Sequence, residues 1–320
     1  MSGRGVLAAA VLLLAGPARA GEPIQVQATP VALQESDASV ERVGPLQFRG
    51  GFVLRSPEPR FGGLSDLVVS PDGAWLAAIG DEGSAFTAGL AYARDGRLTG
   101  LGPASLAALK DTAGQPLRGK GNQDAESLAR LADGSFAVGF EGWHRLWRYS
   151  PSLDVPARAL PAPPGLEEAP ANEGLETLVG LADGRLLALT EGLMSGGAVQ
   201  GWLRSDAGWR RLGYRVSGAL RPSGGCSLPS GDVVVLERNY TPETGVVVGL
   251  RRIPIASIVP GAVLGGETLA RLARPLSVDN FEGLACRQSA AGETLLYLLS
   301  DDNFSSRQRT LLMMFRLDHS

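Results

Sequence analysis

The chain has 320 residues, of which 44% are hydrophobic and 20% charged, with 43 Gly, 21 Pro and a formal net charge of −3 at pH 7. This composition is typical of a turn-rich globular protein with enough apolar residues for a large core. Because the chain is mildly acidic and has no run of basic residues, we expect no nucleic acid partner.

The first twenty residues are typical of a secretory signal peptide. Arg4 precedes an apolar run, Val6–Leu14, and Ala18-Arg19-Ala20 supplies small residues for cleavage. This run is too short to span a bilayer, and no later run is long enough. We therefore expect a periplasmic or secreted protein with no membrane span. The expected division is a signal peptide, an N-terminal lead and a single domain, at residues 1–20, 21–45 and 46–320.

The first expected strand, at 46–55, stands alone and alternates apolar with other residues. Five copies of one pattern follow it: a polar entry, an apolar strand, a turn with Gly, a second apolar strand and an acidic exit. The entry residues are Ser65, Glu126, Glu176, Ser223 and Glu282. The turn Gly follows the entry by eight residues in the first four copies, at 73, 134, 184 and 231, and by ten in the fifth, at 292.

Further strands are expected after each of these strand pairs, two in the first four copies and one in the last. They are expected at 87–93 and 97–101, 145–149 and 155–160, 200–204 and 209–216, 246–253 and 268–272, and 310–317. The connection 102–123 is rich in small residues and has room for a short helix at 104–109.

Four copies thus contain four strands and the fifth contains three, so the isolated strand at 46–55 would complete the fifth. A ring of sheets closed in this way is a β-propeller, which leaves few exposed sheet edges. The repeat length of roughly 50 residues lies in the propeller range. We therefore predict an all-β propeller with five blades. Six blades is the alternative, if the connection 102–123 contains a degenerate blade. A two-sheet sandwich would not explain the regular spacing from entry to turn.

In such a ring the first strand of each blade lines the channel and the second returns antiparallel, so strand entries and exits meet on one face. The entries would form an inner ring there. The exits would form an outer collar of Asp81, Glu82, Glu141, Glu191, Glu237, Asp301 and Asp302.

Carboxylates that converge in a region of low dielectric repel one another strongly. A hard divalent cation with oxygen ligands would neutralise them, and a wide ring suits Ca²⁺ better than Mg²⁺. The expected metal ligands are Ser65, Glu126, Glu176, Ser223 and Glu282. The alternative is that each Glu is a solvated residue at the end of a strand.

Several motifs resemble the "esterase-like activity of phytase", or phytase-like, domain of exported bacterial proteins. They are Glu126-Ser-Leu-Ala with Asp133-Gly134-Ser135-Phe136, Asn172-x-Gly174-x-Glu176, Asn280-Phe281-Glu282-Gly283-Leu284-Ala285 and Ser300-Asp301-Asp302-Asn303-Phe304. The resemblance extends over roughly residues 46–317 and implies hydrolysis of phosphate or other esters.

A more distant resemblance is to calcium-activated apyrases, which are five-bladed propellers with one central Ca²⁺ and a Ser or Glu at the head of each innermost strand. The matching segments are Gly63-Leu64-Ser65-Asp66-Leu67, Ala125-Glu126, Pro222-Ser223-Gly224 and Phe281-Glu282-Gly283. This resemblance supports five blades and the metal. In the third blade Glu173 also fits the apyrase pattern, although Glu176 keeps the internal register.

A cation at the channel mouth could polarise a phosphoryl or acyl oxygen and orient a water molecule, with a collar carboxylate as general base. The catalytic candidates are Glu141, Glu191 and Asp301. The substrate-binding candidates are Arg238, Asp302 and Asn303, with Arg238 as the cation for an anionic oxygen. Lysine occurs only at positions 110 and 120, so phytate fits poorly and a less charged phosphoester or carboxylic ester fits better.

The predicted function is therefore that of an exported, Ca²⁺-binding propeller, a monomer that hydrolyses a small-molecule ester or phosphoester. One alternative is a non-catalytic propeller, in which Ca²⁺ only stiffens the ring and the face binds a protein or cell-envelope ligand. Another is a lactonase-like, six-bladed propeller that would use Asn172, Asn280 and Asn303. The sequence leaves open whether the chain is an enzyme.

The two cysteines, Cys226 and Cys286, lie at equivalent places in neighbouring copies of the repeat. Either a disulfide or two buried thiols is compatible with these positions. The only histidines, His144 and His319, exclude a His-rich zinc site, and we expect His144 to serve in packing.

Overall fold

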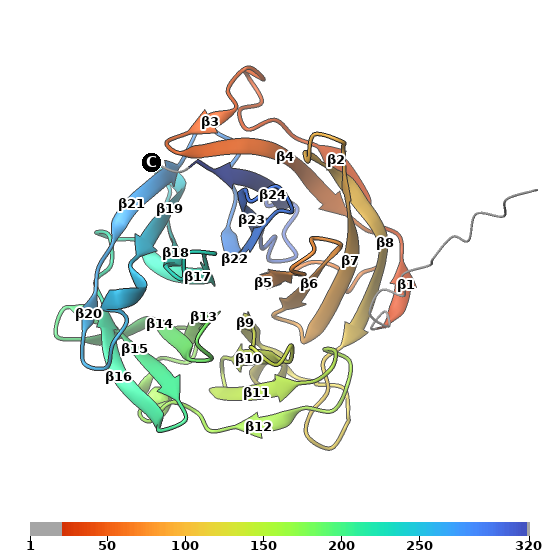
Figure 1. Ribbon diagram of the computed structural model, residues 1–320. Helices are drawn as coiled ribbons and strands as arrows, with labels where there is room; N and C mark the ends of the chain where they lie inside the picture. The colour runs from red at the N-terminus through yellow and green to blue at the C-terminus, as the bar shows by residue number, and fades with distance from the viewer. Residues whose placement is uncertain (1–20, 319–320) are drawn as a thin grey trace, which may run out of the picture.

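Strand pairing arranges residues 21–318, the part that the computed structural model describes, into five sheets around a central axis (Figure 1). The protein is a five-bladed β-propeller, as predicted. The expected signal peptide and His319 lie outside the described residues. Within those residues no helix is both long enough and apolar enough to cross a membrane.

The innermost strands are the five that carry the entry residues. They are β5 (Leu64–Val69), β9 (Ala125–Arg130), β13 (Leu175–Gly180), β17 (Arg221–Ser227) and β22 (Phe281–Gln288). The second strands are β6 (Trp75–Gly80), β10 (Phe136–Phe140), β14 (Leu186–Ser195), β18 (Val233–Thr241) and β23 (Thr294–Ser300). The third strands are β7 (Ser84–Tyr92), β11 (Arg145–Tyr149), β15 (Ala198–Ser205), β19 (Gly245–Ile253) and β24 (Thr310–Leu317). The fourth strands are β8 (Leu98–Ala108), β12 (Arg158–Leu160), β16 (Gly208–Tyr214), β21 (Glu267–Leu272) and β4 (Leu46–Arg55).

The ring is closed by β4, which comes from the beginning of the domain and pairs antiparallel with β24 at its end. The pairing runs from Leu46 opposite Leu317 to Leu54 opposite Thr310. This confirms the prediction that the strand at 46–55 completes the fifth blade. Closure removes two edges that would otherwise expose unpaired backbone groups.

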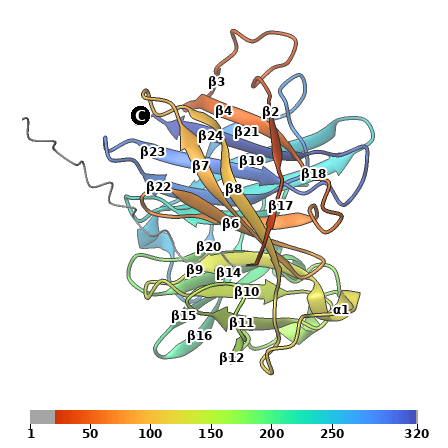
Figure 2. The same ribbon diagram turned by 90° about the vertical axis from the view of Figure 1, so that its right-hand side faces the viewer.

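Short strands of the lead extend two of the sheets. Strand β1 (Glu22–Ile24) pairs with β8, and β2 (Gln27–Pro30) and β3 (Arg42–Val43) pair with β4. Figure 2 shows β2 beside β8 on the side of the ring that faces the viewer. A further short strand, β20 (Val263–Leu264), runs parallel to β16 at the edge of the third blade.

The connection 102–123 contains no additional blade, and the helix expected at 104–109 is wrong. Residues Ala104–Ala108 continue β8 and pair with β7, because Ala104 and Leu106 bury alternate side chains in the core. The described helices are short: α1 (Lys120–Gln123) and the 3₁₀ turns Leu166–Glu168 and Ile255–Ser257.

Five apolar clusters fill the spaces between neighbouring blades. Alternate residues of a strand point to opposite faces, so each sheet packs against both of its neighbours. Trp202, for example, is fully buried between the second and third blades. This packing fixes the innermost strands around the axis and thereby positions the channel.

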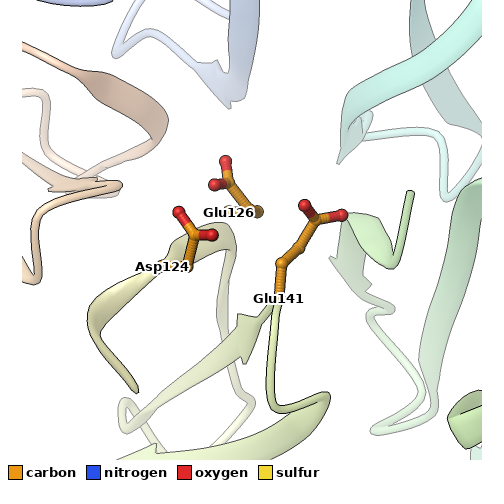
Figure 3. Close-up of side chains that lie close together, drawn as sticks. All are labelled: Asp124, Glu126 and Glu141. Carbon is orange, nitrogen blue, oxygen red and sulfur yellow. The ribbon is translucent and has the colours of Figure 1, made fainter. Parts of the chain in front are cut away.

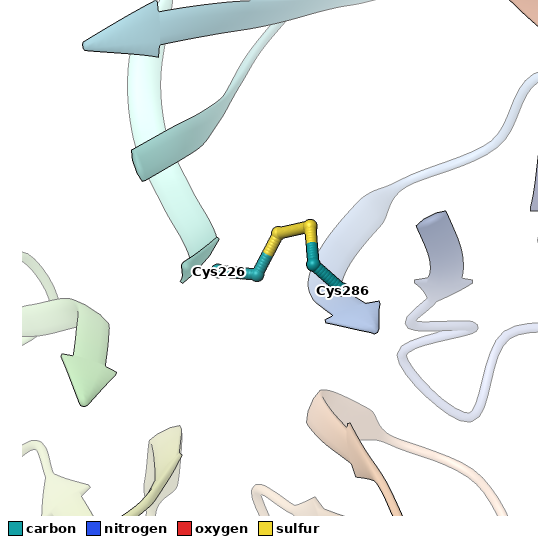
Figure 4. The surroundings of a disulfide bond; sticks show 2 residues. All are labelled: Cys226 and Cys286. Atoms are coloured by element: carbon teal, nitrogen blue, oxygen red, sulfur yellow. A yellow bond between two sulfur atoms is a disulfide. The ribbon is translucent and has the colours of Figure 1, made fainter. Parts of the chain in front are cut away.

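The two cysteines form a disulfide that links β17 to β22, the innermost strands of the fourth and fifth blades (Figure 4). Their Cα atoms are 5.5 Å apart. Both residues line a cavity of about 710 Å³ formed by the C-terminal ends of the innermost strands. This cavity opens at the end of the channel opposite the entry residues.

Candidate metal centre at the channel mouth

A β-bulge occurs at the same place in all five blades, where the innermost strand begins. In the first blade Leu64 pairs with Gly80 and Asp66 pairs with Ile79, so Ser65 has no partner in the ladder. The unpaired residues of the other blades are Glu126, Glu176, Ser223 and Glu282. A bulge frees a residue from the ladder and redirects its side chain. The five predicted metal ligands therefore share one backbone feature at one end of the channel.

Three carboxylates of the second blade converge at this end (Figure 3). Asp124 precedes β9, Glu126 is the bulged residue of that strand, and Glu141 follows β10. One carboxylate oxygen from each lies within 4.8 Å of the others. Since Ca²⁺ binds oxygen at about 2.3–2.6 Å, a single cation between them could contact all three.

Backbone hydrogen bonds fix this carboxylate triplet, defined as Asp124, Glu126 and Glu141. The Glu141 amide donates to the Asp124 carbonyl at 2.8 Å, which holds the two strand ends together. The Gly174 amide, from the third blade, donates to Glu141 Oε1. The Glu176 side chain also lies within hydrogen-bonding reach of Glu141.

Ionisation of the triplet is unfavourable in the absence of a cation. Burial raises the pKa of Glu141 to about 7, and it also raises the pKa of Asp124. Burial, together with the charges of Glu282, Glu141 and Asp124, raises the pKa of Glu126 well above its usual range. These groups resist ionisation unless a positive charge joins them, and their hard oxygen donors suit a cation such as Ca²⁺.

The other ring residues surround the same space. Burial raises the pKa of Glu176 well above its usual range, with the charge of Glu126 the next cause. Burial also raises the pKa of Glu282 to about 8. The hydroxyl of Ser223 donates to the Phe281 carbonyl at 3.3 Å, and Ser65 is fully buried.

Glu282 forms an ion pair with an arginine. Arg238 Nη2 lies 2.8 Å from Glu282 Oε1, and Asn280 Nδ2 donates to the same oxygen at 2.8 Å. Arg238 also interacts electrostatically with Glu176 and Glu191. The predicted anion-binding Arg is therefore at the channel mouth, where it pairs with a ring carboxylate.

The strand exits form a collar. In each blade the residue just before the ring residue pairs with a residue of the second strand, and the next residue along the second strand is here called the collar residue. In blades one, two, three and five this residue donates its amide to a carbonyl two residues before the ring residue. The collar consists of Asp81, Glu141, Glu191, Arg238 and Asp301.

The expectation that Glu237 belongs to the collar is wrong, because Arg238 occupies that place in the fourth blade. Strand alternation sends Glu237 to the other side, where it is fully buried between blades. It accepts hydrogen bonds from the Tyr214 hydroxyl at 2.9 Å and the Ser217 amide at 3.1 Å. Its role is structural.

The remaining collar carboxylates also have perturbed acidity. Burial raises the pKa of Asp81 to about 7 and that of Asp301 to about 6. Burial raises the pKa of Glu191 as well, although Arg238 opposes the change. Glu82, by contrast, is exposed.

Asp302 and Asn303 lie in the loop that follows Asp301. Asp302 Oδ1 accepts from the amides of Gly63 at 2.9 Å and Phe304 at 3.1 Å, and its Oδ2 accepts from the Thr310 hydroxyl at 2.9 Å. Asp302 is thus engaged in holding the loop, whereas Asn303 is exposed and has a positive φ of 48°.

Sequence reasoning missed two acidic residues of this region. Asp124 lies two residues before Glu126, just ahead of β9, and that short spacing was the available signal. Asp66 is fully buried and accepts from the amides of Leu67 and Leu128, both at 2.7 Å, which ties the first blade to the second. Nothing in the sequence distinguishes it from other strand residues.

His144 lies half-buried at the edge of this face. Its Nε2 lies 3.2 Å from the carbonyls of Ala169 and Pro170. The guanidinium of the next residue, Arg145, lies over the Phe140 ring at 3.9 Å from its centroid.

Residues 59–304 match the model of the phytase-like family, described as "Esterase-like activity of phytase". No curated protein matches the chain. Among solved structures, it is similar to a protein of unknown function from Dyadobacter fermentans, with a TM-score of 0.44, 10% identity and coverage of 93% of this chain and 96% of that one. It is also similar to a gluconolactonase from Xanthomonas campestris, with a TM-score of 0.41, 13% identity and coverage of 94% and 99%. A third similar structure is virginiamycin B lyase from Staphylococcus aureus, with a TM-score of 0.41, 8% identity and coverage of 92% of this chain and 100% of that one.

Proposed function

The chain belongs to the phytase-like family, and on that premise we propose that it is an exported, Ca²⁺-dependent hydrolase of small-molecule esters or phosphoesters. The observation that most supports this proposal is the convergence of Asp124, Glu126 and Glu141 within 4.8 Å at the channel mouth. Three carboxylates with raised pKa values in a channel are typical of a site that binds and uses a cation.

The metal would be held by the triplet, with oxygens of Glu176 and the ring serines completing a coordination shell of the size that Ca²⁺ prefers. When bound, Ca²⁺ supplies Lewis-acid polarisation of a phosphoryl or acyl oxygen. In this proposal Glu141, first considered as a base, serves as a ligand because it lies within the triplet.

The general base is then one of the two remaining catalytic candidates, Glu191 or Asp301, which are collar carboxylates outside the triplet. A base works best when its pKa lies near the working pH, and Asp301 has a pKa of about 6. Arg238 stabilises the negative charge that develops on the substrate oxygen, and its pairing with Glu282 holds it at the mouth. Asn303 is retained as a substrate contact, whereas Asp302 positions the loop that carries it.

Export through residues 1–20 to the periplasm or medium is part of the proposal. The disulfide between Cys226 and Cys286 agrees with it, because such bonds persist mainly in oxidising compartments. We propose that the exported protein acts as a monomer.

The test uses purified residues 21–320, analysed for metal as purified and assayed before and after chelation, and compares them with a Glu126→Gln variant. The control is Glu267→Gln, which removes an exposed carboxylate on an outer strand. Elemental analysis should find Ca²⁺ in the wild type and the control but not in Glu126→Gln. Hydrolysis of a panel of acyl esters, phosphomonoesters, phosphodiesters and nucleotides should depend on Ca²⁺ and be lost in the same variant.

Absence of bound metal in the wild type would contradict the proposed site. Stoichiometric Ca²⁺ without turnover of any ester would instead favour the non-catalytic alternative, in which the ion stiffens the ring and the face binds a partner.

A further inference from the structure

Four large hydrophobic side chains are exposed on the face where the carboxylates open. Trp143, Met194, Tyr240 and Phe304, here called the apolar rim, have exposed fractions of 61%, 48%, 64% and 40%. Each comes from a different blade. Trp143 and Phe304 lie in the connection between the second and third strands, whereas Met194 and Tyr240 lie in the second strands just before that connection. That connection is on the same face as the collar.

The rim residues recur at nearly the same place in the repeat. Each follows the collar residue of its blade by two or three positions, after Glu141, Glu191, Arg238 and Asp301 respectively. Single exposed hydrophobic residues are normal on a protein surface. The rim differs from them because its members recur at nearly one position in four blades. Among the described residues, the other large hydrophobic side chains with comparable exposure are Val259 and Val263.

Phe304 is held in place by a strained loop. Asn303 and Phe304 both have positive φ, at 48° and 49°, a conformation that Asn tolerates but that is unfavourable for a bulky residue such as Phe. Asp302 stabilises it by accepting from the Phe304 amide. The ring rests on Gly63, where an added Cβ would come within 2.5 Å of a ring carbon. Such strain persists where the surroundings enforce it, and it is found most often at functional sites.

The charges at the mouth disfavour a substrate with many negative groups. Four of the five blades place at least one ring or collar carboxylate at the mouth, and the second blade adds Asp124. The cation at the mouth, Arg238, is already paired with Glu282. A polyphosphorylated molecule would meet repulsion at the mouth and apolar side chains around it.

We propose that the apolar rim binds the non-reacting part of the substrate, so that the ester hydrolysed in the channel carries an aromatic or long aliphatic group. This inference rests on the proposed hydrolase function and specifies its substrate class. Trp143 and Tyr240 offer rigid, amphipathic contact area at little entropic cost, and Met194 adapts to irregular apolar shapes. The rim acts on binding, so it should affect KM more than kcat.

The kinetic test compares two esters of one leaving group, an acetate and an octanoate, in the Ca²⁺-loaded protein. The wild type should prefer the octanoate in kcat/KM. In Trp143→Ala and Tyr240→Ala this preference should fall about tenfold, mainly through a higher KM for the octanoate. The matched control is Val259→Ala, which removes a side chain that is 47% exposed on the opposite face. Its neighbour Ile258 accepts a hydrogen bond from Arg185 of the turn after β13.

A binding test separates failure of this inference from failure of the proposed function. Calorimetry with a non-hydrolysable octyl ether should show binding to the wild type and Val259→Ala, and weaker binding to the two rim variants. If esters are hydrolysed but acetate is preferred, or the rim variants keep the wild-type preference, the substrate class is wrong while the hydrolase function stands. If nothing is hydrolysed, the function fails, and absence of ether binding would overturn the rim as well.

Discussion

Replacing Glu141 with Gln should stabilise the metal-free protein at alkaline pH and abolish most of its response to Ca²⁺. Burial raises the pKa of Glu141 from 4.5 to about 7. The difference of about 2.5 pKa units corresponds to about 3 kcal/mol of unfolding free energy once the group is ionised in both states. Gln has no charge to bury, and its Oε1 can still accept from the Gly174 amide.

The direction in which this stability difference changes with pH follows from proton binding at Glu141. Between pH 4.5 and pH 7 the folded wild type holds a proton at Glu141 more tightly than the unfolded chain does. The associated stability is fully present below pH 4.5 and is lost as the pH rises through 7. The variant has no such dependence, so its advantage should be small at pH 5 and largest at pH 8.

The assay is thermal unfolding in chelator at pH 5, 6.5 and 8, followed by the same series with Ca²⁺. At pH 8 without metal, Glu141→Gln should unfold roughly 5 °C or more above the wild type. Added Ca²⁺ should raise the midpoint of the wild type and of the Glu267→Gln control, but hardly that of the variant. The reasoning fails if the metal-free variant is less stable than the wild type at pH 8, or if its advantage does not change with pH.

Three further predictions concern the frame around the site. Burial raises the pKa of Asp66 well above its usual range, so Asp66→Asn is best tested at pH 5, where loss of the charge contributes least. There the substitution should destabilise the protein by roughly 2 kcal/mol in chemical denaturation, because an amide nitrogen replaces one acceptor of the Leu67 and Leu128 amides. Equal stability to the exposed-site control Asp206→Asn would contradict this. Reduction of the disulfide, whose cysteines are 60 residues apart, should cost about 4 kcal/mol. The Cys226→Ala/Cys286→Ala double variant should be equally destabilised and insensitive to reductant, and a reductant effect on that variant would argue against the assignment. Gly63→Ala should lower the melting temperature more than Gly184→Ala. Both positions have positive φ, but only at Gly63 would the new Cβ lie 2.1 Å from Asp81 and displace Phe304; equal effects would show that these contacts relax freely.

The fold could be predicted because the chain repeats itself. Entry residues, turn glycines and strand lengths recur in register, and the missing strand of the last blade pointed to the one at 46–55, which the structure pairs with β24. The continuation of β8 over Ala104–Ala108 was missed because its small residues have weak strand preference, and pairing with β7 decides its conformation.

The candidate site could be predicted only in outline. The sequence located the ring residues, and the structure places all five at equivalent bulges. The sequence did not show that Arg238 rather than Glu237 faces the channel, because a bulge changes which alternate residues of a strand share a side. Asp124 was missed because its partnership with Glu141 arises only when the two strand ends meet.

Because of the recurring bulge, the residues that face the channel mouth are not the residues that hold the blades together. A residue that has no place in the ladder can be exchanged without loss of an interstrand hydrogen bond, and this chain already uses Ser at two such positions and Glu at three. The charge of the mouth can therefore be altered one blade at a time while the scaffold stays intact. If the mouth binds a cation as proposed, a single substitution at one of these positions would change the charge that the ring offers to it.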